Sequence, residues 1–550
     1  MRHGGKILIN QLEAQGARAA FTVPGESFLA ALDGLHDSNQ IQTVICRQEG
    51  GAAMMAEAYG KVTGEPGVCF VTRGPGAANA MSGLHIAQQD STPMVTFIGM
   101  PASDVEDREA FQEIEIKQLY ASFVKWSAVI RQTDRIPEYV SRAFHAARSG
   151  RPGPVVLGLP EDMLAANIEA ADVPAANPAM SAPSSEDMAR LAALLERAER
   201  PFVILGGPGW SAELQRAMQD FASRFALPVG CAFRFQDYFD NRHPCYAGHI
   251  GIGPDAKLVE AVKEADVLLV IGARLGEMTT SGYSLLDIPS PRQTLVHAHP
   301  SPDELGSVYR PDLAIASSAA AFVGALTRLE TPAARPWSGR TTELHRAQEA
   351  VLKPIPLPGA VQFAEVVRTV SEMLPEDGFV ANGAGNYAAF LHRYFEYKGY
   401  RTQLAPTSGS MGYGLPAAIA AKIAAPNRAA VAFAGDGCFM MTSQELATAV
   451  QYGLPVVVII ANNGMYGTIR AHQEREYPGR VVGTTLVNPD FAAFARSFGA
   501  NGVTIERTED FRGAFGEALA ANRPTLIELK LDPEALSPRQ TLSAIRNAKR

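Results

Sequence analysis

The sequence predicts an α/β protein made of three doubly wound parallel-sheet domains, and three observations predict it. The chain has 550 residues, enough for about three domains at roughly 100–200 residues each. Short runs of apolar, β-branched residues recur along it, separated by stretches of helical character. The runs are continuously apolar rather than alternating, which is typical of strands buried on both faces of a parallel sheet.

The expected strands are spread along the whole chain, with two linkers between them. The clearest runs are 68–72 (VCFVT), 94–98 (MVTFI), 154–158 (PVVLG), 202–205 (FVIL), 267–271 (VLLVI), 430–434 (AVAFA) and 455–461 (PVVVIIA). Ala, Pro and Ser dominate 171–186, and 331–358 contains several prolines, so both segments indicate linkers. We therefore expect domains at 1–170, 187–330 and 355–535, followed by a basic and mobile tail, 537–550.

Composition and charge exclude several classes of function. The formal net charge is −8, and no long basic run precedes the tail, so nucleic acid and anionic membranes are poor partner candidates. The N-terminal segment is neither a secretory signal nor a membrane span. The cysteines contain no CxxC pair, which argues against a zinc site or a disulfide framework; they are Cys46, Cys69, Cys231, Cys245 and Cys438. These features together predict a cytoplasmic protein.

The strongest chemical signal lies in the expected third domain. The strand at 430–434 runs into Gly435-Asp436-Gly437, and the strand at 455–461 ends in Asn462-Asn463. Glycines let a backbone approach phosphate oxygens, and the N-terminus of the helix that follows favours an anion. Asp436 and Asn463 offer the oxygen ligands that Mg²⁺ prefers. The pattern predicts a diphosphate and magnesium site; two ordinary turns are the alternative.

This motif, in which Asn463 follows Asp436 by 27 positions (463 − 436), resembles the diphosphate-binding motif of the thiamine diphosphate enzymes. The resemblance implies thiamine diphosphate and Mg²⁺ as cofactors, with the backbone carbonyl of Met465 as a third metal contact. It also implies that Met411, in 408–416 (SGSMGYGLP), supports the bent cofactor, although a core methionine is the alternative. The cofactor-binding residues that it implies are Glu49, Pro24, Gly25, Asn79, Gly383, Asn386, Tyr387, Gly409, Met411, Gly435, Gly437, Cys438, Met465 and Tyr466.

Residues 47–60 (RQEGGAAMMAEAYG) resemble the family segment that carries the activating glutamate, here Glu49. In that chemistry a buried carboxylic acid protonates the aminopyrimidine ring of the cofactor, which then removes the thiazolium proton. The alternative is a solvated carboxylate at a helix N-terminus. In the family this glutamate reaches the cofactor of another subunit, so the resemblance implies a homodimer or a homotetramer.

The chain resembles the branch of acetolactate synthase large subunits in particular. The segments that carry this likeness are 24–27 (PGES), 74–79 (GPGAAN), 111–113 (FQE), 150–160 (GRPGPVVLGLP), 271–274 (IGAR) and 411–418 (MGYGLPAA). The implied reaction is decarboxylation of a 2-oxo acid followed by carboligation with a 2-oxo acid or aldehyde. A related lyase or decarboxylase of an aromatic 2-oxo acid or 2-hydroxyacyl compound is the alternative. A binding protein without the chemistry is a third reading, which the joint presence of Glu49, Asp436 and Asn463 argues against.

Two departures from that branch lie on the acceptor side. The branch usually has a tryptophan where His472 stands and a lysine where Glu161 stands. Candidates to line the substrate or steer the second step are Phe111, Gln112, His472 and Ser27; for Phe111 and Gln112, a pair on a helix surface is the alternative.

The expected central domain has Gly-rich turns at 205–209 (LGGPG) and 270–274 (VIGAR). In some branches this domain binds FAD or ADP, so FAD is a further candidate cofactor, with Arg274 near the adenine. Such turns are weak evidence alone, and a purely structural Arg274 is the alternative.

Overall fold

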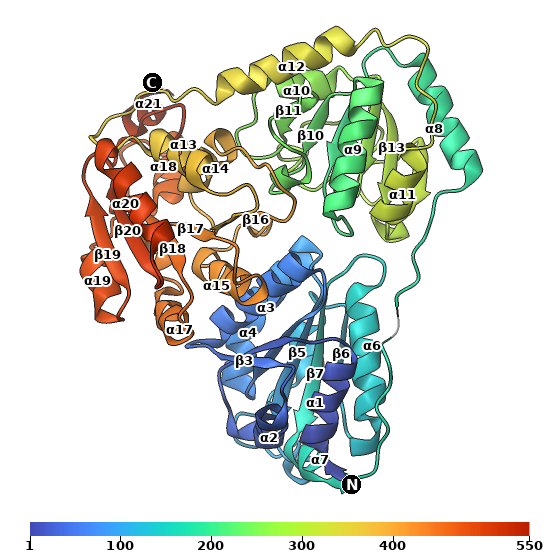
Figure 1. The fold of residues 1–550 in the computed structure, drawn as a ribbon, viewed down its shortest axis with the longest axis vertical. Helices are drawn as coiled ribbons and strands as arrows, with labels where there is room; N and C mark the ends of the chain where they lie inside the picture. Colours follow the sequence, from blue (N-terminus) through green and yellow to red (C-terminus); the bar gives the residue numbers. More distant parts are fainter. Residues whose placement is uncertain (176, 549–550) are drawn as a thin grey trace.

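The computed structural model describes residues 1–175 and 177–548 and confirms the expected fold class. Three six-stranded parallel sheets lie in three lobes of the described chain (Figure 1). We call them the N-lobe (2–168), the middle lobe (185–326) and the C-lobe (363–530). The domain boundaries expected from the sequence, at 1–170, 187–330 and 355–535, remain predictions. Residue 176 of the first expected linker and residues 549–550 of the expected tail lie outside the described residues.

The N-lobe sheet has the strand order β3-β2-β4-β5-β7-β6. Its strands are β2 (Ala19–Thr22), β3 (Gln42–Ile45), β4 (Gly67–Val71), β5 (Met94–Met100), β6 (Trp126–Val129) and β7 (Pro154–Pro160). Its helices are α1 (Gly4–Ala14), α2 (Leu29–Asp37), α3 (Glu49–Thr63), α4 (Gly74–Asp90), α5 (Ile116–Tyr120), α6 (Ile136–Arg148) and α7 (Glu161–Ala165). A short antiparallel pair, β1 (Arg2–His3) and β8 (Asn167–Ile168), joins the two ends of the lobe.

The middle-lobe sheet has the order β11-β10-β9-β12-β13-β14. Its strands are β9 (Phe202–Leu205), β10 (Val229–Cys231), β11 (Tyr246–His249), β12 (Val267–Ile271), β13 (Thr294–His299) and β14 (Leu313–Ala316). Its helices are α8 (Ser185–Arg197), α9 (Ala212–Phe225), α10 (Ala256–Lys263) and α11 (Ala319–Leu326).

The C-lobe sheet has the order β16-β15-β17-β18-β20-β19. Its strands are β15 (Phe379–Asn382), β16 (Gln403–Leu404), β17 (Ala430–Gly435), β18 (Val456–Asn462), β19 (Asn501–Ile505) and β20 (Thr525–Lys530). Its helices are α13 (Phe363–Met373), α14 (Tyr387–Tyr394), α15 (Gly414–Ala424), α16 (Asp436–Phe439), α17 (Leu446–Gln451), α18 (Gly467–Glu476), α19 (Phe491–Ser497) and α20 (Thr508–Ala520).

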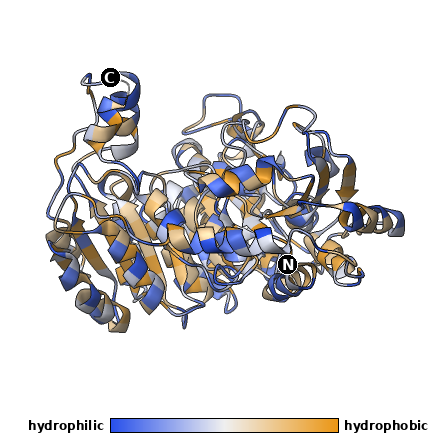
Figure 2. Ribbon diagram, turned by 90° about the horizontal axis from the view of Figure 1, so that it is seen from above, coloured by the Kyte–Doolittle hydropathy of each residue, from blue (hydrophilic) through white to orange (hydrophobic). Residues whose placement is uncertain are grey.

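One hydrophobic core is shared by the N-lobe and the C-lobe. It runs from the strands of one sheet through α3, α4 and α15 to the strands of the other. The helices approach closely because they are rich in small residues: a Cβ at Gly83 of α4 would lie 2.5 Å from the Cβ of Ala53 on α3. Figure 2 shows mainly hydrophobic residues on the strands, while the helices carry both hydrophilic and hydrophobic residues. The two lobes therefore form one packed body.

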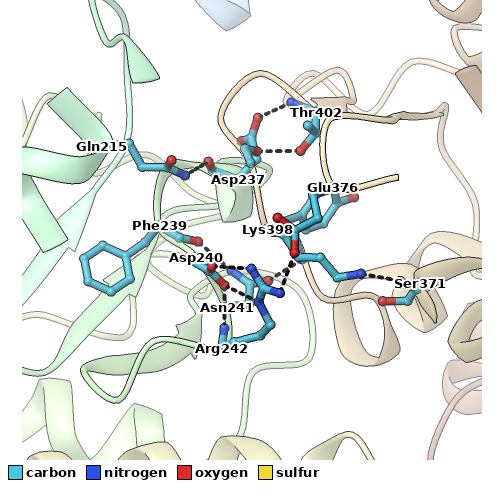
Figure 3. A network of polar contacts seen from close by, with 12 residues as sticks. Gln215, Asp237, Phe239, Asp240, Asn241, Arg242, Ser371, Glu376, Lys398 and Thr402 are labelled. Atoms are coloured by element: carbon cyan, nitrogen blue, oxygen red, sulfur yellow. Dashed lines mark hydrogen bonds and ion pairs between the residues drawn. The ribbon is translucent and has the colours of Figure 1, made fainter. Parts of the chain in front are cut away.

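A polar seam joins the middle lobe to the C-lobe (Figure 3). The carboxylate of Asp237 accepts hydrogen bonds from the backbone N–H groups of Thr402 (3.0 Å) and Gln403 (3.1 Å), at the edge strand β16. Asn241 and Tyr397 exchange two hydrogen bonds of 2.9 Å, one through the Asn241 side chain. The seam fixes the middle lobe against the edge of the C-lobe sheet.

Two expected irregular segments contain helices. The prolines of 331–358 flank α12 (Ser338–Val351), which packs on the middle lobe, where His345 Nδ1 lies 3.0 Å from the carbonyl oxygen of Tyr246. The expected mobile tail contains α21 (Leu542–Asn547), whose Arg546 pairs with Glu474 of α18 at 2.7 Å. Leu542 is buried against Met465. Within residues 537–548, an acidic partner and an apolar contact hold α21 against the C-lobe.

No helix in the described residues is long and apolar enough to cross a membrane. All five cysteines are free and buried.

Candidate active site

The C-lobe carries the glycine and acid motif at one edge of its sheet. Strands β17 and β18 are neighbours, with Gly435 opposite Ala461, so Asp436 and Asn463 follow adjacent strand ends. Ligands of open parallel sheets bind at this carboxyl edge. A cavity of about 240 Å³ lies there, and the residues lining it include Gly385, Asn386, Tyr387, Gly409, Met411, Gly435, Asp436, Gly437, Cys438, Asn463, Met465 and Tyr466. The cavity thus gathers most of the C-lobe residues predicted from the sequence; Gly383 does not line it but lies next to Cys438, which does.

Asp436 is buried, and neutral amides hold its carboxylate. Oδ1 accepts a hydrogen bond from the backbone N–H of Gly437 (2.8 Å), and Oδ2 accepts from that of Gly464 (2.9 Å) and from Nδ2 of Asn488 (2.7 Å). Burial raises the pKa of Asp436, and these hydrogen bonds oppose the rise. The negative charge has no cationic partner among these donors, which fits a site that takes a metal cation.

Asn488 is a site residue that the sequence reasoning missed. Its Nδ2 also donates to Oδ1 of Asn462 (3.0 Å), so it bridges the ends of β17 and β18. It lies 52 residues beyond Asp436, in a loop without regular spacing, and no sequence signal marks it. Asn463 is half-buried, and its Oδ1 accepts only a long bond from Met465 N–H (3.3 Å).

The floor of the cavity depends on close packing at glycine. A Cβ at Gly383 would lie 2.7 Å from Sγ of Cys438 and 3.2 Å from the backbone oxygen of Ser410. Tyr387 is buried beside them; its hydroxyl accepts from Gly383 N–H (2.9 Å) and lies 3.3 Å from Cys438 Sγ. Burial raises the pKa of Tyr387 well above its usual value, so it is a neutral phenol. Met411 is half-buried at the cavity wall.

Glu49 begins α3 in the N-lobe, away from this cavity within one chain. It is half-buried, and its Oε2 accepts a hydrogen bond from Nδ2 of Asn79 (2.9 Å). Gly51, in the same first turn of α3, packs on Glu445 of the same chain. Pro24 is exposed, and Gly25 lies against Thr72 at the same carboxyl edge of the N-lobe sheet. One chain therefore keeps the N-lobe residues and the C-lobe cavity as two separate surfaces.

The candidates on the substrate side differ in their exposure. Phe111 is 70% exposed, and Gln112 has a left-handed backbone, with φ of 60°. Ser27, by contrast, is fully buried; its Oγ pairs with Thr72 Oγ1 at 2.9 Å, so it cannot present its hydroxyl to a substrate. Glu161 forms an ion pair with Arg73.

A second cavity, of about 810 Å³, adjoins the first and lies where the three lobes meet. His472 is exposed at its wall, with Nδ1 3.1 Å from Arg475 Nη1. Arg274 also lines it, but its Nε pairs with Glu304 (3.3 Å) and its Nη1 donates to the carbonyl of Gln89 (3.1 Å). Arg274 thus has a structural role in joining the middle lobe to the N-lobe.

Comparisons with known proteins cover the three lobes. Models of the thiamine pyrophosphate enzymes match the N-terminal TPP binding domain at residues 2–119, the central domain at 188–326 and the C-terminal TPP binding domain at 383–529. The chain is 33% identical to the acetolactate synthase large subunit of Parasynechococcus marenigrum, over 96% of this chain and 87% of that one. It is 30% identical to the large subunit from Corynebacterium glutamicum, over 97% and 87%. It is 29% identical to the Escherichia coli isozyme 2 large subunit, over 96% of each.

Proposed function

The chain belongs to the thiamine pyrophosphate enzymes, as a relative of the acetolactate synthase large subunits, and on that premise we propose its reaction. It decarboxylates a 2-oxo acid and couples the product to a second 2-oxo acid or an aldehyde. The observation that carries the proposal is the buried carboxylate of Asp436, held by neutral amides at the rim of a glycine-lined cavity.

Asp436, Asn463 and the carbonyl of Met465 would hold Mg²⁺, which would supply the positive charge that the carboxylate lacks. Gly435, Gly437 and Asn386 would receive the diphosphate, and Met411 would support the rings of the cofactor. Thiamine diphosphate supplies the electron sink that makes loss of CO₂ from a 2-oxo acid feasible. The chain's part is to position the substrate and exclude water, for which the buried Tyr387 and Cys438 form a dry floor.

We also propose that a second copy of the chain completes the site. Glu49 provides a carboxyl group at the half-buried start of α3. The C-lobe cavity is lined by no acidic residue from the N-lobe of its own chain. A homodimer that placed Glu49 of one copy at the C-lobe cavity of the other would bury this carboxyl and let it exchange a proton with the cofactor. A homotetramer would contain the same pairing twice.

Phe111, Gln112 and His472 are the residues that we propose to meet the substrate. The exposed phenyl ring of Phe111 suits an apolar substrate group. A related lyase or decarboxylase remains the second candidate, because His472 and Glu161 replace residue types that the resembling branch uses on the acceptor side.

FAD is a further candidate for the cavity of about 810 Å³, which is large enough for a nucleotide. The turns 205–209 and 270–274 pack directly on each other at Gly207 and Gly272, and Gly207 and Arg274 line the cavity. A yellow colour in the purified protein would support FAD; a colourless protein that takes up no added FAD would exclude it.

The test is product identification with the full-length protein, thiamine diphosphate and Mg²⁺, on a panel of 2-oxo acids with and without aldehydes. We expect CO₂ and a coupled 2-hydroxy ketone or acid. Asp436→Asn should raise the Mg²⁺ concentration needed for half-maximal rate by about tenfold or more. Asp490→Asn, which changes an exposed helix cap in the same lobe, should not. Aldehyde without coupled product would favour the decarboxylase, and turnover unaffected by a chelator would contradict the metal site.

A further inference from the structure

A strained loop carries Phe111 and Gln112. The loop, residues 101–115, connects β5 to α5, and three of its non-glycine residues have left-handed backbones: Asp107 (φ 60°), Glu109 (φ 56°) and Gln112 (φ 60°). Each such conformation costs roughly 1–3 kcal/mol and persists only where surrounding contacts impose it. The question is which contacts impose it here.

Within the loop, one carboxylate bridges the strained Asp107 and the nearby Ala110. Glu113 accepts hydrogen bonds from the backbone N–H groups of Asp107 and Ala110, each at 2.8 Å. These bonds shape the loop but do not fix it to the sheet edge. Ser103 and Glu106, nearer the start of the loop, contact Asp162 and Arg131, so Phe111 and Gln112 need an anchor of their own.

That anchor is Arg73 and the first turn of α4. Gly74 N–H donates to the carbonyl of Gln112 (2.9 Å), and Arg73 Nη1 donates to the carbonyl of Phe111 (3.4 Å). A Cβ at Gly74 would lie 3.0 Å from the Gln112 oxygen, so a larger residue would push this bond open. The loop is thus fixed at the backbone of the two residues proposed to meet the substrate.

Two carboxylates hold Arg73 in turn. It is only 8% exposed and pairs with Glu161, at the start of α7, and with Glu26 (3.4 Å). A nearly buried guanidinium is costly unless it is paired. Both carboxylates neutralise it, so Arg73 does not offer a free charge to a substrate carboxylate. Its position suits an anchor rather than a binding group.

We propose that Arg73 is a positioning residue that, held by Glu161 and Glu26, fixes Phe111 and Gln112 and so sets how much product is coupled rather than released as aldehyde. The proposal rests on the proposed function, since it takes Phe111 and Gln112 as substrate-facing. A small displacement of such groups is enough to cost a large factor in rate.

The test uses the full-length enzyme with cofactor and three variants. They are Arg73→Ala, Arg73→Lys and a charge-swapped double variant, Arg73→Glu with Glu161→Arg. Amide hydrogen exchange of residues 107–113 and the ratio of coupled product to aldehyde are measured together. For Arg73→Ala we expect exchange about tenfold faster in this segment and a ratio about tenfold lower. Arg73→Lys keeps the charge without the fork and should fall between. The charge-swapped variant places a carboxylate, which cannot donate a hydrogen bond, opposite the Phe111 carbonyl, so it should lose as much as Arg73→Ala.

Arg135→Ala is the matched control, because it removes an exposed ion pair with Glu138 on the same lobe. It should change neither quantity. An Arg73→Ala protein that exchanges like wild type in 107–113, or that loosens there with an unchanged product ratio, would overturn the proposal. If wild type forms no product at all, the proposed function fails, while the exchange data still decide whether Arg73 anchors the loop.

Discussion

The shape of the C-lobe cavity depends on single residues, and Gly383 is the clearest example. Gly383→Ala places a methyl group against Cys438 Sγ and the backbone of Ser410. The backbone cannot retreat as a side chain could, so we expect thiamine diphosphate to bind about tenfold to a hundredfold more weakly. Titration of the cofactor against intrinsic fluorescence measures this.

Gly513→Ala is the control for that prediction. No atom lies within 4 Å of a Cβ at this position in α20, so the change should leave cofactor affinity intact and slightly favour the helix. Equal affinity of the two variants for thiamine diphosphate would show that Gly383 does not shape the cavity.

At the residue scale, the sequence predicts those site residues whose positions follow from regular spacing. Asp436 and Asn463 stand at fixed offsets from apolar runs, so their meeting at one sheet edge follows from the pattern. Asn488 reaches Asp436 from an irregular loop, and only the folded chain reveals it. Ser27 fails as a substrate residue because its neighbours, Thr72 and Gly99, enclose it, and no local pattern encodes that enclosure.

At the scale of elements, each continuous apolar run predicts a strand correctly, whereas a strand interrupted by polar residues, such as β13, gives no such run. β13 contains His297 and His299, both buried. Burial lowers the pKa of His297 to about 4, so the imidazole is neutral, and its Nε2 lies 2.9 Å from the carbonyl oxygen of Ala273. A hydropathy pattern cannot register this, because neutrality comes from the tertiary environment.

The seam between the middle lobe and the C-lobe predicts a pH dependence (Figure 3). Burial raises the pKa of Asp237 from 3.8 to about 6. The folded state therefore binds a proton that the unfolded state has lost between these values, and stability falls as pH rises through this window. Asp237→Asn removes the fall, so it should be more stable than wild type by up to roughly 3 kcal/mol above the window and gain nothing below it.

Urea unfolding at about pH 4 and about pH 7.5 measures this difference. Gln215→Ala is the control, since it removes the 2.8 Å hydrogen bond to the Asp237 carbonyl and leaves the carboxyl in place. Its loss of stability should be the same at both pH values. An Asp237→Asn protein whose advantage does not change with pH would contradict the assignment.

At the scale of the whole molecule, the shared core makes the N-lobe and C-lobe one body, with Glu49 and the C-lobe cavity on separate surfaces of it. A site that joins the two needs a second copy, and a twofold assembly forms two such sites at once. The parts of a site are then divided between chains, and that division can be detected without a structure of the assembly.

Glu49→Gln and Asp436→Asn should each abolish most activity alone, yet recover it when mixed. If each site takes Glu49 from one chain and Asp436 from the other, a mixed dimer has one doubly altered site and one intact site. Half of the dimers are mixed after random exchange of subunits, so about one quarter of wild-type activity should return. Glu49→Gln mixed with Glu49→Ala contains no intact site and should stay inactive. Activity no higher than the sum of the separate variants, with subunit exchange shown by mass spectrometry, would mean that each chain builds its site alone.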